Sequence, residues 1–500
     1  MSTRHLLVHE MRVLTRGCTA LVVLPLLVIV VAYAAGNGVR WTREQQSTIQ
    51  RVQAEDERTY AVIANQLDEL ARQGDPQPSL QLAGMAWYIF QPEGAIAPAP
   101  HLDPRRAEAA ASEWLGARHA VLPPAPLAPL AVGQSDLHPY YTRVTIRTRP
   151  ALVNSDEIEN PVNLLTGRFD LAFALTFCWP LLVLPLIYNV LSEDRDNGTL
   201  ALVASQAVSI RRLTALRLLL RVGLAVVLTI ATSMATLAAL SASGRGPTAL
   251  GLSTWSAAVA ATGLFWTGIA ALVNTARWRS ATNAVVMTAV WLFAGIVVPA
   301  VMSEVAGALA PVPSRVQIIN EIRAAGNMRP GELAGLLTAY YEEHPDAVRS
   351  NESADVTAIR GLALQDETAR RIDPILSAYR RATARQERVA NVLRFASPLL
   401  LIHDSVAELA GTTTARYRRF AEQLDSYHRA WRAYFYPLVH ARASLTKADY
   451  ERAPRFAFED ETGGARELRA ALLIASAAVV GIALLAVAFR RAPTAGVTMT

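Results

Sequence analysis

The chain has 500 residues, of which 52% are hydrophobic, and its mean hydropathy is +0.22. Soluble enzymes rarely have such a composition, and the apolar residues lie in a few long runs, so we expect an α-helical polytopic membrane protein. The formal net charge is +6, but the cationic residues are nearly all arginines spread between the apolar runs. This spread indicates membrane topology, and no binding of nucleic acid is expected.

The N-terminal residues 1–16 predict an amphipathic helix at the inner membrane face. Apolar and basic side chains fall on opposite sides of this helix, although Glu10 interrupts the apolar side. Residues 17–36 form an apolar run of about 20 residues, long enough for a first membrane span. A cleaved signal peptide is the alternative, but the run is too long and lacks a convincing cleavage site. The two faces consist of Leu6, Leu7, Met11 and Leu14 and of Arg4, Arg12 and Arg16.

Residues 37–169 predict a first extracytoplasmic domain. Apolar residues recur at helical spacing from Trp41 to Gln73, so the first membrane helix is expected to continue out of the membrane. Prolines then interrupt the chain, and one short helix is expected near residues 106–118. Alternation of residue types from Tyr141 to Arg147 predicts a strand.

Five further apolar runs predict the remaining spans, which gives six in total. The third span is expected to begin at Val222, because Arg217 and Arg221 precede it and an arginine at mid-membrane costs about 2.5–3.5 kcal/mol. These two arginines are therefore expected in the headgroup layer, in a cytoplasmic loop at residues 192–221. The predicted spans are residues 170–191, 222–240, 252–273, 284–305 and 468–489, followed by a cytoplasmic tail at residues 490–500.

Residues 306–467 predict a second extracytoplasmic domain, which is mostly helical. Residues 354–372, 374–392 and 412–436 carry apolar residues at helical spacing. Asp170 and Glu304 fall at the outer ends of spans, where helix capping or solvation is expected of them.

Arginines in the short segments predict that both termini are cytoplasmic and that the chain lies in the cell (inner) membrane. Most of these arginines fall on one side of a six-span arrangement, and the positive-inside rule assigns that side to the cytoplasm. Arg245, Arg466 and Arg469 count against this orientation, whereas the two large domains carry little weight because long domains cross regardless of charge. The arginines on the cytoplasmic side are Arg4, Arg12, Arg16, Arg195, Arg211, Arg212, Arg217, Arg221, Arg277, Arg279, Arg490 and Arg491.

Common motifs for catalysis are missing from the sequence. The only lysine is Lys447, preceded by Thr446, so a Walker-type phosphate loop is impossible and the chain is not expected to hydrolyse ATP by itself. The usual zinc-protease and serine-hydrolase motifs are absent, and the nine histidines show no ligand spacing. Cys18 and Cys178 cannot form a metal site alone. We therefore expect no enzyme activity, cofactor or metal in this chain.

The polar loop between the second and third predicted spans is the strongest functional candidate. Gly198 permits a bend, Asn197 or Thr199 can cap a helix, and an amphipathic helix is expected to begin at Leu200. A short helix joined to two spans can transmit a push from a cytoplasmic partner. An ordinary loop without a partner is the alternative on these features alone.

The same loop resembles that of export-class (type 2) ABC transporter permeases, in which an acidic residue, Gly-Thr-Leu and a Ser-Gln-Pro-Val-like segment join the second and third spans. Here Ala207 stands where proline is usual. Other segments are similar to a narrower branch of these permeases, which has large extracytoplasmic insertions after the first and fifth spans. That insertion is catalogued as a domain of unknown function. The matching segments are Leu191-Ser192-Glu193, Gly198-Thr199-Leu200, Ser205-Gln206-Ala207-Val208-Ser209, Asn160-Pro161, Leu164-Leu165, Gly167, Phe169-Asp170-Leu171-Ala172-Phe173, Phe395-Ala396-Ser397-Pro398 and Leu409-Ala410-Gly411-Thr412.

This resemblance implies a permease subunit in the lipid bilayer that pairs with a separate ABC ATPase subunit and with a second permease chain, identical or related. Glu193, Gly198 and Thr199 are then expected to contact the ATPase. Arg211 and Arg212 are expected to anchor the loop at lipid headgroups or at the ATPase. The alternatives are a non-transporting membrane sensor or envelope assembly factor, and a membrane enzyme with a site in its outer domains.

Overall fold

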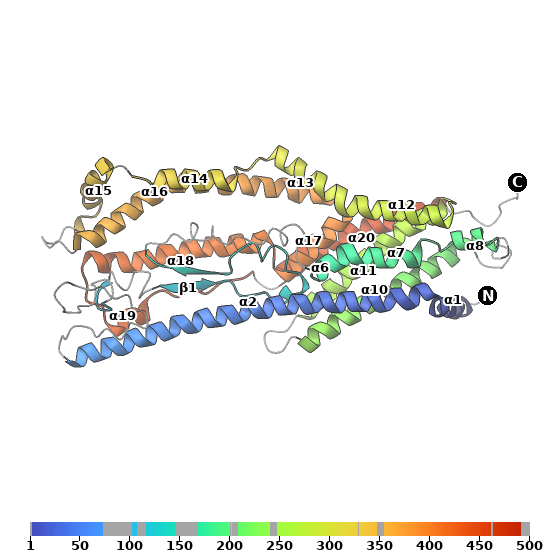
Figure 1. Cartoon of the computed structure of the whole chain (residues 1–500), viewed down its shortest axis with the longest axis horizontal. Coiled ribbons are helices and arrows are strands. Elements are labelled where there is room, and N and C mark those ends of the chain that lie inside the picture. The colour runs from blue at the N-terminus through green and yellow to red at the C-terminus, as the bar shows by residue number, and fades with distance from the viewer. Residues whose placement is uncertain are drawn as a thin grey trace, which may run out of the picture.

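The computed structural model describes residues 3–73, 103–107, 117–146, 169–200, 202, 209–240, 248–328, 330–347, 355–461 and 464–491. The molecule is elongated (Figure 1). Helices α1 (Thr3–Arg16) and α8 (Ser192–Asp196) and the last turns of α20 (Ala465–Arg491) lie at one end, which we call the terminal end. The part beyond the spans at the opposite end, which contains α14 to α16, α18, α19, the sheet and the last turns of α2, is called the extension.

Among the described residues, six helices are long and apolar enough to cross a membrane. The only sheet in the same residues has two strands. The chain is therefore an α-helical polytopic membrane protein, which confirms the predicted fold class. The six candidate spans are Cys18–Arg72, Leu171–Asp196, Ile210–Ala239, Ala249–Thr275, Ser280–Leu309 and Ala465–Arg491.

The first span continues without a break into the extension as α2 (Cys18–Gln73), a helix of 56 residues. This confirms the expected helical continuation beyond residue 41. Where α2 leaves the spans, Gly38 contacts the short helix η3 (Ala128–Leu130). A Cβ at Gly38 would lie 1.9 Å from the carbonyl oxygen of Pro129, so only glycine allows this close approach.

The second and fifth spans each contain a π-helical segment followed by a proline. Proline has no N–H to donate, and the widened turn before it accommodates the missing hydrogen bond. The two π segments also meet, because a Cβ at Gly295 would lie 3.5 Å from the Phe177 ring, and Trp291 of α12 donates its Nε1–H to the carbonyl of Phe177 at 3.1 Å. In order, the segments are α6 (Leu171–Phe173), η4 (Ala174–Cys178) and α7 (Trp179–Ile187) with Pro180, and α12 (Ser280–Leu292), η5 (Phe293–Val297) and α13 (Val298–Leu309) with Pro299.

Helices α11 (Ala249–Thr275) and α20 approach each other closely through glycines. A Cβ at Gly481 would lie 3.0 Å from the backbone nitrogen of Phe265, and one at Gly268 would lie 2.9 Å from the carbonyl oxygen of Gly481. In the most apolar stretch of α11, 61% of residues are buried, whereas the value for Ser280–Leu309 is 11%. The spans therefore form a bundle with α11 inside and the fifth span at its margin.

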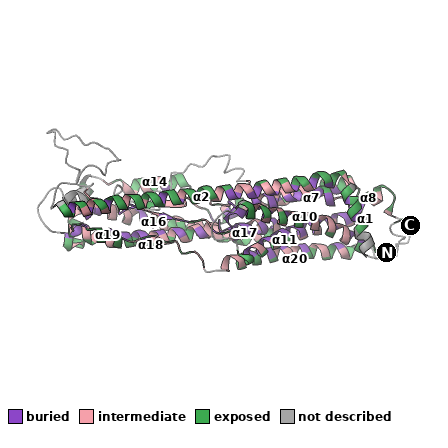
Figure 2. Cartoon of the chain, turned by 90° about the horizontal axis from the view of Figure 1, so that it is seen from below, coloured by how far each residue is buried: buried purple, intermediate pink, exposed green. Residues whose placement is uncertain are grey.

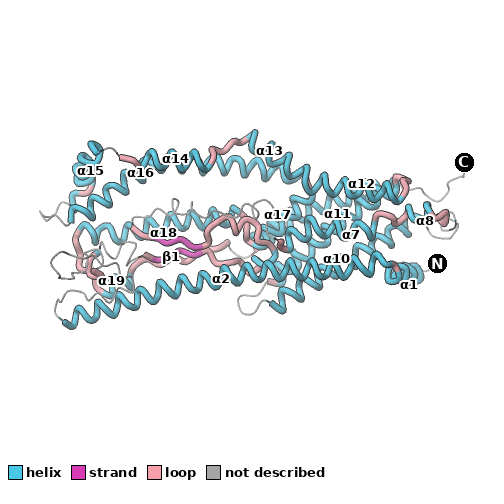
Figure 3. Tube along the Cα trace, in the orientation of Figure 1, coloured by secondary structure: helices cyan, strands magenta, loops and turns pink. Residues whose placement is uncertain are grey.

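The sheet of the extension pairs β1 (Arg118–Val121) with β2 (Tyr141–Val144) in antiparallel register, with Arg118 opposite Val144. It lies between α2 and α18 (Figure 3). The strand predicted at residues 141–147 is therefore present over its first four residues. The helix predicted near residues 106–118 falls largely outside the described residues, and its last residue belongs to β1. There the Arg118 guanidinium lies 3.8 Å from the centroid of the Tyr60 ring, a contact that favours the strand.

The second large region is helical, as predicted. Its helices, ahead of α17, are α14 (Arg315–Gly326), α15 (Pro330–Glu343), η6 (Pro345–Ala347), α16 (Asp355–Leu393) and η7 (Arg394–Ala396), and after it α18 (Thr414–His440) and α19 (Lys447–Arg452). The two helices expected on either side of residue 373 are one continuous helix, α16, through Pro374. Contacts on both sides override the proline: Ile372 is buried, and Arg380 pairs with Asp425 of α18 at 2.9 Å.

Exposed residues predominate on α14 and on the extension part of α2 (Figure 2).

Helix α17 (Pro398–Ala410) belongs with the spans, although it lies within the sequence region 306–467. The Ser397 side chain accepts a hydrogen bond from the Leu400 backbone N–H and begins the helix, and Gly411, at φ 67°, ends it. Its buried leucines are part of the same hydrophobic cluster as the spans. The Ser-Pro and Gly-Thr segments quoted above therefore mark the two ends of one helix that connects the extension to the bundle.

Candidate functional site

Helix α8 is a short helix within the polar loop, at the terminal end (Figure 1). Glu193 and Asp194 lie in its first turn, where carboxylates interact favourably with the helix dipole. The helix ends at Gly198, whose φ is 70°. The backbone N–H of Thr199 donates to the carbonyl of Asp194 at 2.8 Å, which is the closing bond of a glycine-terminated helix. The bend expected at Gly198 is therefore present.

Three of the proposed contact residues lie together on the exposed side of this turn. Glu193 is exposed and accepts a hydrogen bond from Asn189 Nδ2 at 2.8 Å. Gly198 is exposed, and a Cβ there would meet no atom within 4 Å. The Thr199 hydroxyl donates back to the Asp194 carbonyl at 3.1 Å, so within the described residues it closes α8.

The other two proposed residues, Arg211 and Arg212, begin α10 (Ile210–Leu240). Arg212 is exposed, and its backbone N–H donates to Ser209 Oγ at 3.2 Å, which caps the helix. Leu200 is helical, but residues 201 and 203–208, including most of the Ser-Gln-Ala-Val segment, lie outside the described residues.

Arg217 lies at the centre of an ionic cluster that the sequence did not reveal. Its Nε donates to Glu10 Oε1 of α1 at 2.8 Å, and its Nη1 donates to the Val190 carbonyl at 2.8 Å and to Asp194 of α8. The side chains of Arg217 and Glu10 are only 13% and 6% exposed. Two carboxylates thus hold Arg217 inside the protein, and Glu10 interrupts the apolar face of α1 because it belongs to this cluster.

Arg221 is also bonded within the protein. Its Nη1 donates to the Leu186 carbonyl at 2.7 Å and lies 3.4 Å from Asn189 Oδ1. Arg217 and Arg221 are one helical turn apart on α10, so together they bond the carbonyls at the end of the second span. Both arginines therefore connect α10 to the start of the loop.

The turn between α11 and α12 is bonded to the other side of α8. The Ser280 backbone N–H and hydroxyl donate to Asp196 Oδ2 at 3.0 and 2.6 Å, and the hydroxyl lies 2.9 Å from Ser192 Oγ. Arg195 Nη1 donates to the Trp278 carbonyl at 3.0 Å. A shift of α8 would therefore break these hydrogen bonds or move the start of the fifth span with it.

Two buried asparagines bond the backbone just before α8. Asn274 of α11 donates to the Ile187 carbonyl at 3.1 Å and accepts from the Leu191 N–H at 3.1 Å. Asn283 of α12 donates to the Tyr188 carbonyl at 3.1 Å. These amides satisfy backbone groups where α7 ends, which buried backbone requires.

The terminal end is thus a polar network in which α8 is bonded to side chains of α10 and α12, while Glu10 of α1 and Asn274 of α11 join the network through Arg217 and Leu191. Such a network transmits displacement, because no member can move while its buried partners stay in place. In the part of the chain that the structure describes, no three His, Cys, Asp or Glu residues are grouped as for a metal ion. In the sequence, the members of the network are visible only as single polar residues at positions where apolar residues predominate. They are Glu10 on the apolar face of residues 1–16, and Arg217, Asn274 and Asn283 in or beside apolar runs.

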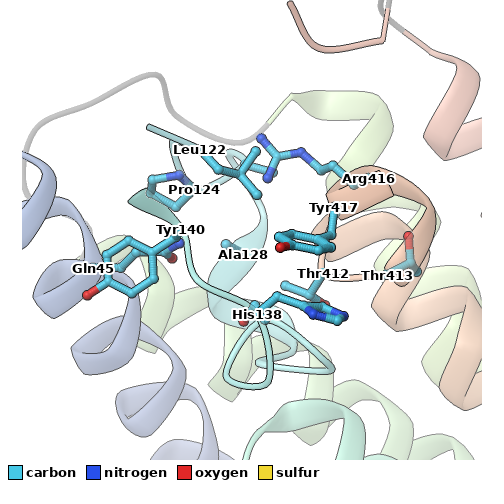
Figure 4. Close-up of a pocket in the computed structure, with 13 residues that line it drawn as sticks. Gln45, Leu122, Pro124, Ala128, His138, Tyr140, Thr412, Thr413, Arg416 and Tyr417 are labelled. Atoms are coloured by element: carbon cyan, nitrogen blue, oxygen red, sulfur yellow. The ribbon is translucent and has the colours of Figure 1, made fainter. Parts of the chain in front are cut away.

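A second polar region lies where the extension meets the spans (Figure 4). His138 stacks on Tyr417, with ring centroids 4.1 Å apart, beside a cavity of about 30 Å³ that Gln45 and Arg416 also line. Burial, together with the charge of Arg315, lowers the pKa of His138 to about 4, so its imidazole is neutral at pH 7. A cavity of this size has room for one or two water molecules and not for a larger ligand.

Asp170 fastens this junction to the second span. Its carboxylate accepts from the backbone N–H groups of Phe173 and Val132, both at 2.8 Å, and it is the N-cap of α6. The capping role expected of Asp170 is therefore observed. The same side chain also positions the loop after η3, which the sequence did not indicate.

Comparison with known proteins identifies one domain. Residues 315–459 match the family described as a domain of unknown function, DUF3526. The match extends from α14 through α19 and so covers most of the region between the fifth and sixth spans. No curated protein and no solved structure matches the chain. The large insertion after the fifth span is thus similar to a recognised domain family, whose description gives it no function.

Proposed function

We propose that this chain is the membrane-spanning permease subunit of an ATP-driven ABC exporter in the cell (inner) membrane, coupled through the loop at residues 192–221 to a separate ABC ATPase. The observation that carries the proposal is the hydrogen bonding of α8 on two sides: Asp194 bonds Arg217 of α10, which also pairs with Glu10 of α1, and Arg195 and Asp196 bond Trp278 and Ser280 where α11 passes into α12. A push on α8 is passed at once to the ends of α10, α11 and α12. This is the mechanical property that a subunit driven from outside the membrane needs.

The charge of the terminal end supports a cytoplasmic orientation for it. Arg12, Arg212, Arg277, Arg279 and Arg490 are exposed there, and arginines at the ends of spans favour the cytoplasmic side. Both termini would then be cytoplasmic and the extension would be extracytoplasmic. Because the chain has no phosphate loop, ATP hydrolysis requires the partner ATPase, and a second permease chain, identical or related, would complete the pathway.

Co-reconstitution tests this proposal. The chain is co-expressed with a candidate ABC ATPase from the same organism and placed with it in lipid nanodiscs, and ATP turnover is measured with and without the chain. We expect turnover to depend on the chain, and Glu193→Ala to lower that dependence. The control is Glu342→Ala, the same change at an exposed glutamate of α15. If the ATPase neither co-purifies nor responds, the transporter assignment fails and a non-transporting sensor or envelope assembly factor replaces it.

Cysteine labelling tests the orientation. In a Cys18→Ser, Cys178→Ser background, a single cysteine is placed at Asn197 in the loop or at Ser426 on α18, both of which are exposed. A membrane-impermeant maleimide added to intact cells should label the Ser426 position and leave the Asn197 position unlabelled until the cells are opened. Labelling of the Asn197 position from outside would contradict the proposed contact between α8 and a cytoplasmic ATPase.

A further inference from the structure

The turn between α11 and α12, residues Ala276 to Arg279, has an unusual backbone. Helix α11 ends with Ala276 as its C-cap, and the next residue, Arg277, has a φ of 63°. Helices that end in this way usually have glycine at that position, because a side chain disfavours the left-handed region. The chain nevertheless has an arginine there, so a side chain is retained where glycine would relieve the strain.

This turn is hydrogen-bonded to α8. Arg195 of α8 donates to the Trp278 carbonyl at 3.0 Å, and Asp196 accepts from both the backbone N–H and the hydroxyl of Ser280. The turn and α8 therefore present a single surface at the terminal end. A surface fixed in advance loses little conformational entropy when a partner binds.

The side chains that this turn exposes are those enriched at protein interfaces. Trp278 is 45% exposed, although tryptophan is usually buried, and it stands between exposed Arg277 and Arg279. Tryptophan and arginine supply most hot spots in interfaces. Arg277 also lies close enough to Arg195 for the two charges to repel, so this edge of the surface favours an acidic partner, whereas Arg279 lies near the Asp196 carboxylate.

We propose that the Ala276–Arg279 turn is a second docking point for the partner ATPase, beside α8, and that it receives an acidic surface with an apolar recess for the Trp278 indole. This inference rests on the proposed function. Anchoring of the indole in lipid headgroups is the competing role, but headgroups are mobile and would not need a turn fixed by hydrogen bonds to α8 in a left-handed conformation. A protein surface of fixed shape does need such a turn.

Two variants in the full chain test the proposal. Arg277→Gly removes the guanidinium and relieves the backbone strain, and Trp278→Ala removes the indole. The affinity of the ATPase for nanodisc-embedded chain is measured by titration, and thermal unfolding is followed by fluorescence. For each variant we expect an affinity lower by about tenfold or more, as at an interface hot spot. For Arg277→Gly the unfolding temperature should be equal to or higher than that of the wild type.

The chain supplies a matched control for the arginine. Arg442 follows Ala441, the C-cap of α18, in the extension, and its φ is 51°. Arg442→Gly makes the same backbone change far from α8 and should leave ATPase affinity unaltered.

The outcomes separate this inference from the proposed function. If the wild-type chain binds no ATPase, both fail. If the wild type binds and both Arg277→Gly and Trp278→Ala bind equally well, only the docking point fails. If Trp278→Ala lowers the unfolding temperature in nanodiscs but leaves the affinity for the ATPase unaltered, the turn is a headgroup anchor and the proposal is overturned.

Discussion

The terminal end and the extension both depend on arginine–carboxylate pairs, but they expose these pairs to very different degrees. Arg217 and Glu10 at the terminal end are 13% and 6% exposed, whereas Arg370 and Glu343 in the extension are 48% and 50% exposed. Buried charges are costly unless every partner is in place, and exposed pairs contribute little. The terminal end is therefore built so that its geometry is enforced, while the surface pairs of the extension can open and close at low cost.

This difference indicates where a mechanical signal can travel. Breaking the Arg217 cluster leaves buried carboxylates without a partner, so the cluster behaves as one unit. Two pairs of α16, Arg370 with Glu343 of α15 and Glu387 with Arg418 of α18, lie at the surface and cannot enforce such a coupling. Variants of arginines that differ in burial, or of their partners, therefore test the comparison.

The largest effect is expected for Arg217→Met. It leaves Glu10 buried without its cation and removes the partner of Asp194, which is 20% exposed; loss of one partner of a buried pair typically costs about 3–5 kcal/mol. Thermal unfolding in detergent should show a marked fall in the unfolding temperature. The double variant Glu10→Leu, Arg217→Met should recover part of the loss, because it removes one of the unpaired charges. An unchanged unfolding temperature in the single variant would show that the buried Glu10 carboxylate does not need Arg217 as its partner.

A smaller effect is expected for Arg416→Met at the base of the extension. Arg416 is 8% exposed and bonds the Pro123 carbonyl at 2.8 Å and Asp460 at 3.0 Å, but Asp460 is 26% exposed and can be solvated when the arginine is lost. Loss of hydrogen bonds from a charged group costs about 1.5–3 kcal/mol. Hydrogen exchange should increase around residues 453–461, while α8 keeps its protection. Equal loss of protection at α8 would mean that the two regions unfold as one unit.

The sequence allowed the spans and the helical continuation of α2 to be predicted, because each depends on local periodicity or on the length of an apolar run. The bend at Gly198 was predictable for a similar reason, since a glycine after a short acidic helix is a local signal. Pro374 misled the prediction of α16, because tertiary contacts on both sides kept the helix continuous.

The cluster at the terminal end was not predictable from local patterns. Arg217 is 207 residues from Glu10 and 23 residues from Asp194, and only the fold brings the three together. The isolated Glu10 in an apolar face and the isolated Arg217 in an apolar run were each visible as exceptions. Their opposite charges could have suggested a pair, but nothing in the spacing indicated which residues would meet.

The acid dependence of the base of the extension is the next smaller effect. Burial raises the pKa of Asp460, but the charges of Arg416 and Arg466 outweigh it and hold the pKa below its ordinary value. A carboxylate with a lowered pKa stabilises the fold above its unfolded pKa, about 3.9, and this stabilisation is lost as pH falls through the folded pKa. The difference in unfolding temperature between wild type and Asp460→Asn should therefore be full at pH 6 and shrink below about pH 4. A difference that stays constant down to pH 2 would contradict this role.

The smallest effect is expected for Arg370→Ala on α16. Arg370 bonds Glu343 at 2.8 Å and Glu367 at 3.1 Å, so by the number of its contacts it looks as important as Arg217. Because Arg370 is exposed, its pairs contribute little: surface pairs add about 0–1 kcal/mol to the free energy of unfolding, and water replaces the lost partner. The unfolding temperature should change only slightly, and raising the salt concentration should reduce the change further. A loss as large as that of Arg217→Met would show that the number of contacts, and not their burial, governs the strength of arginine pairs in this protein.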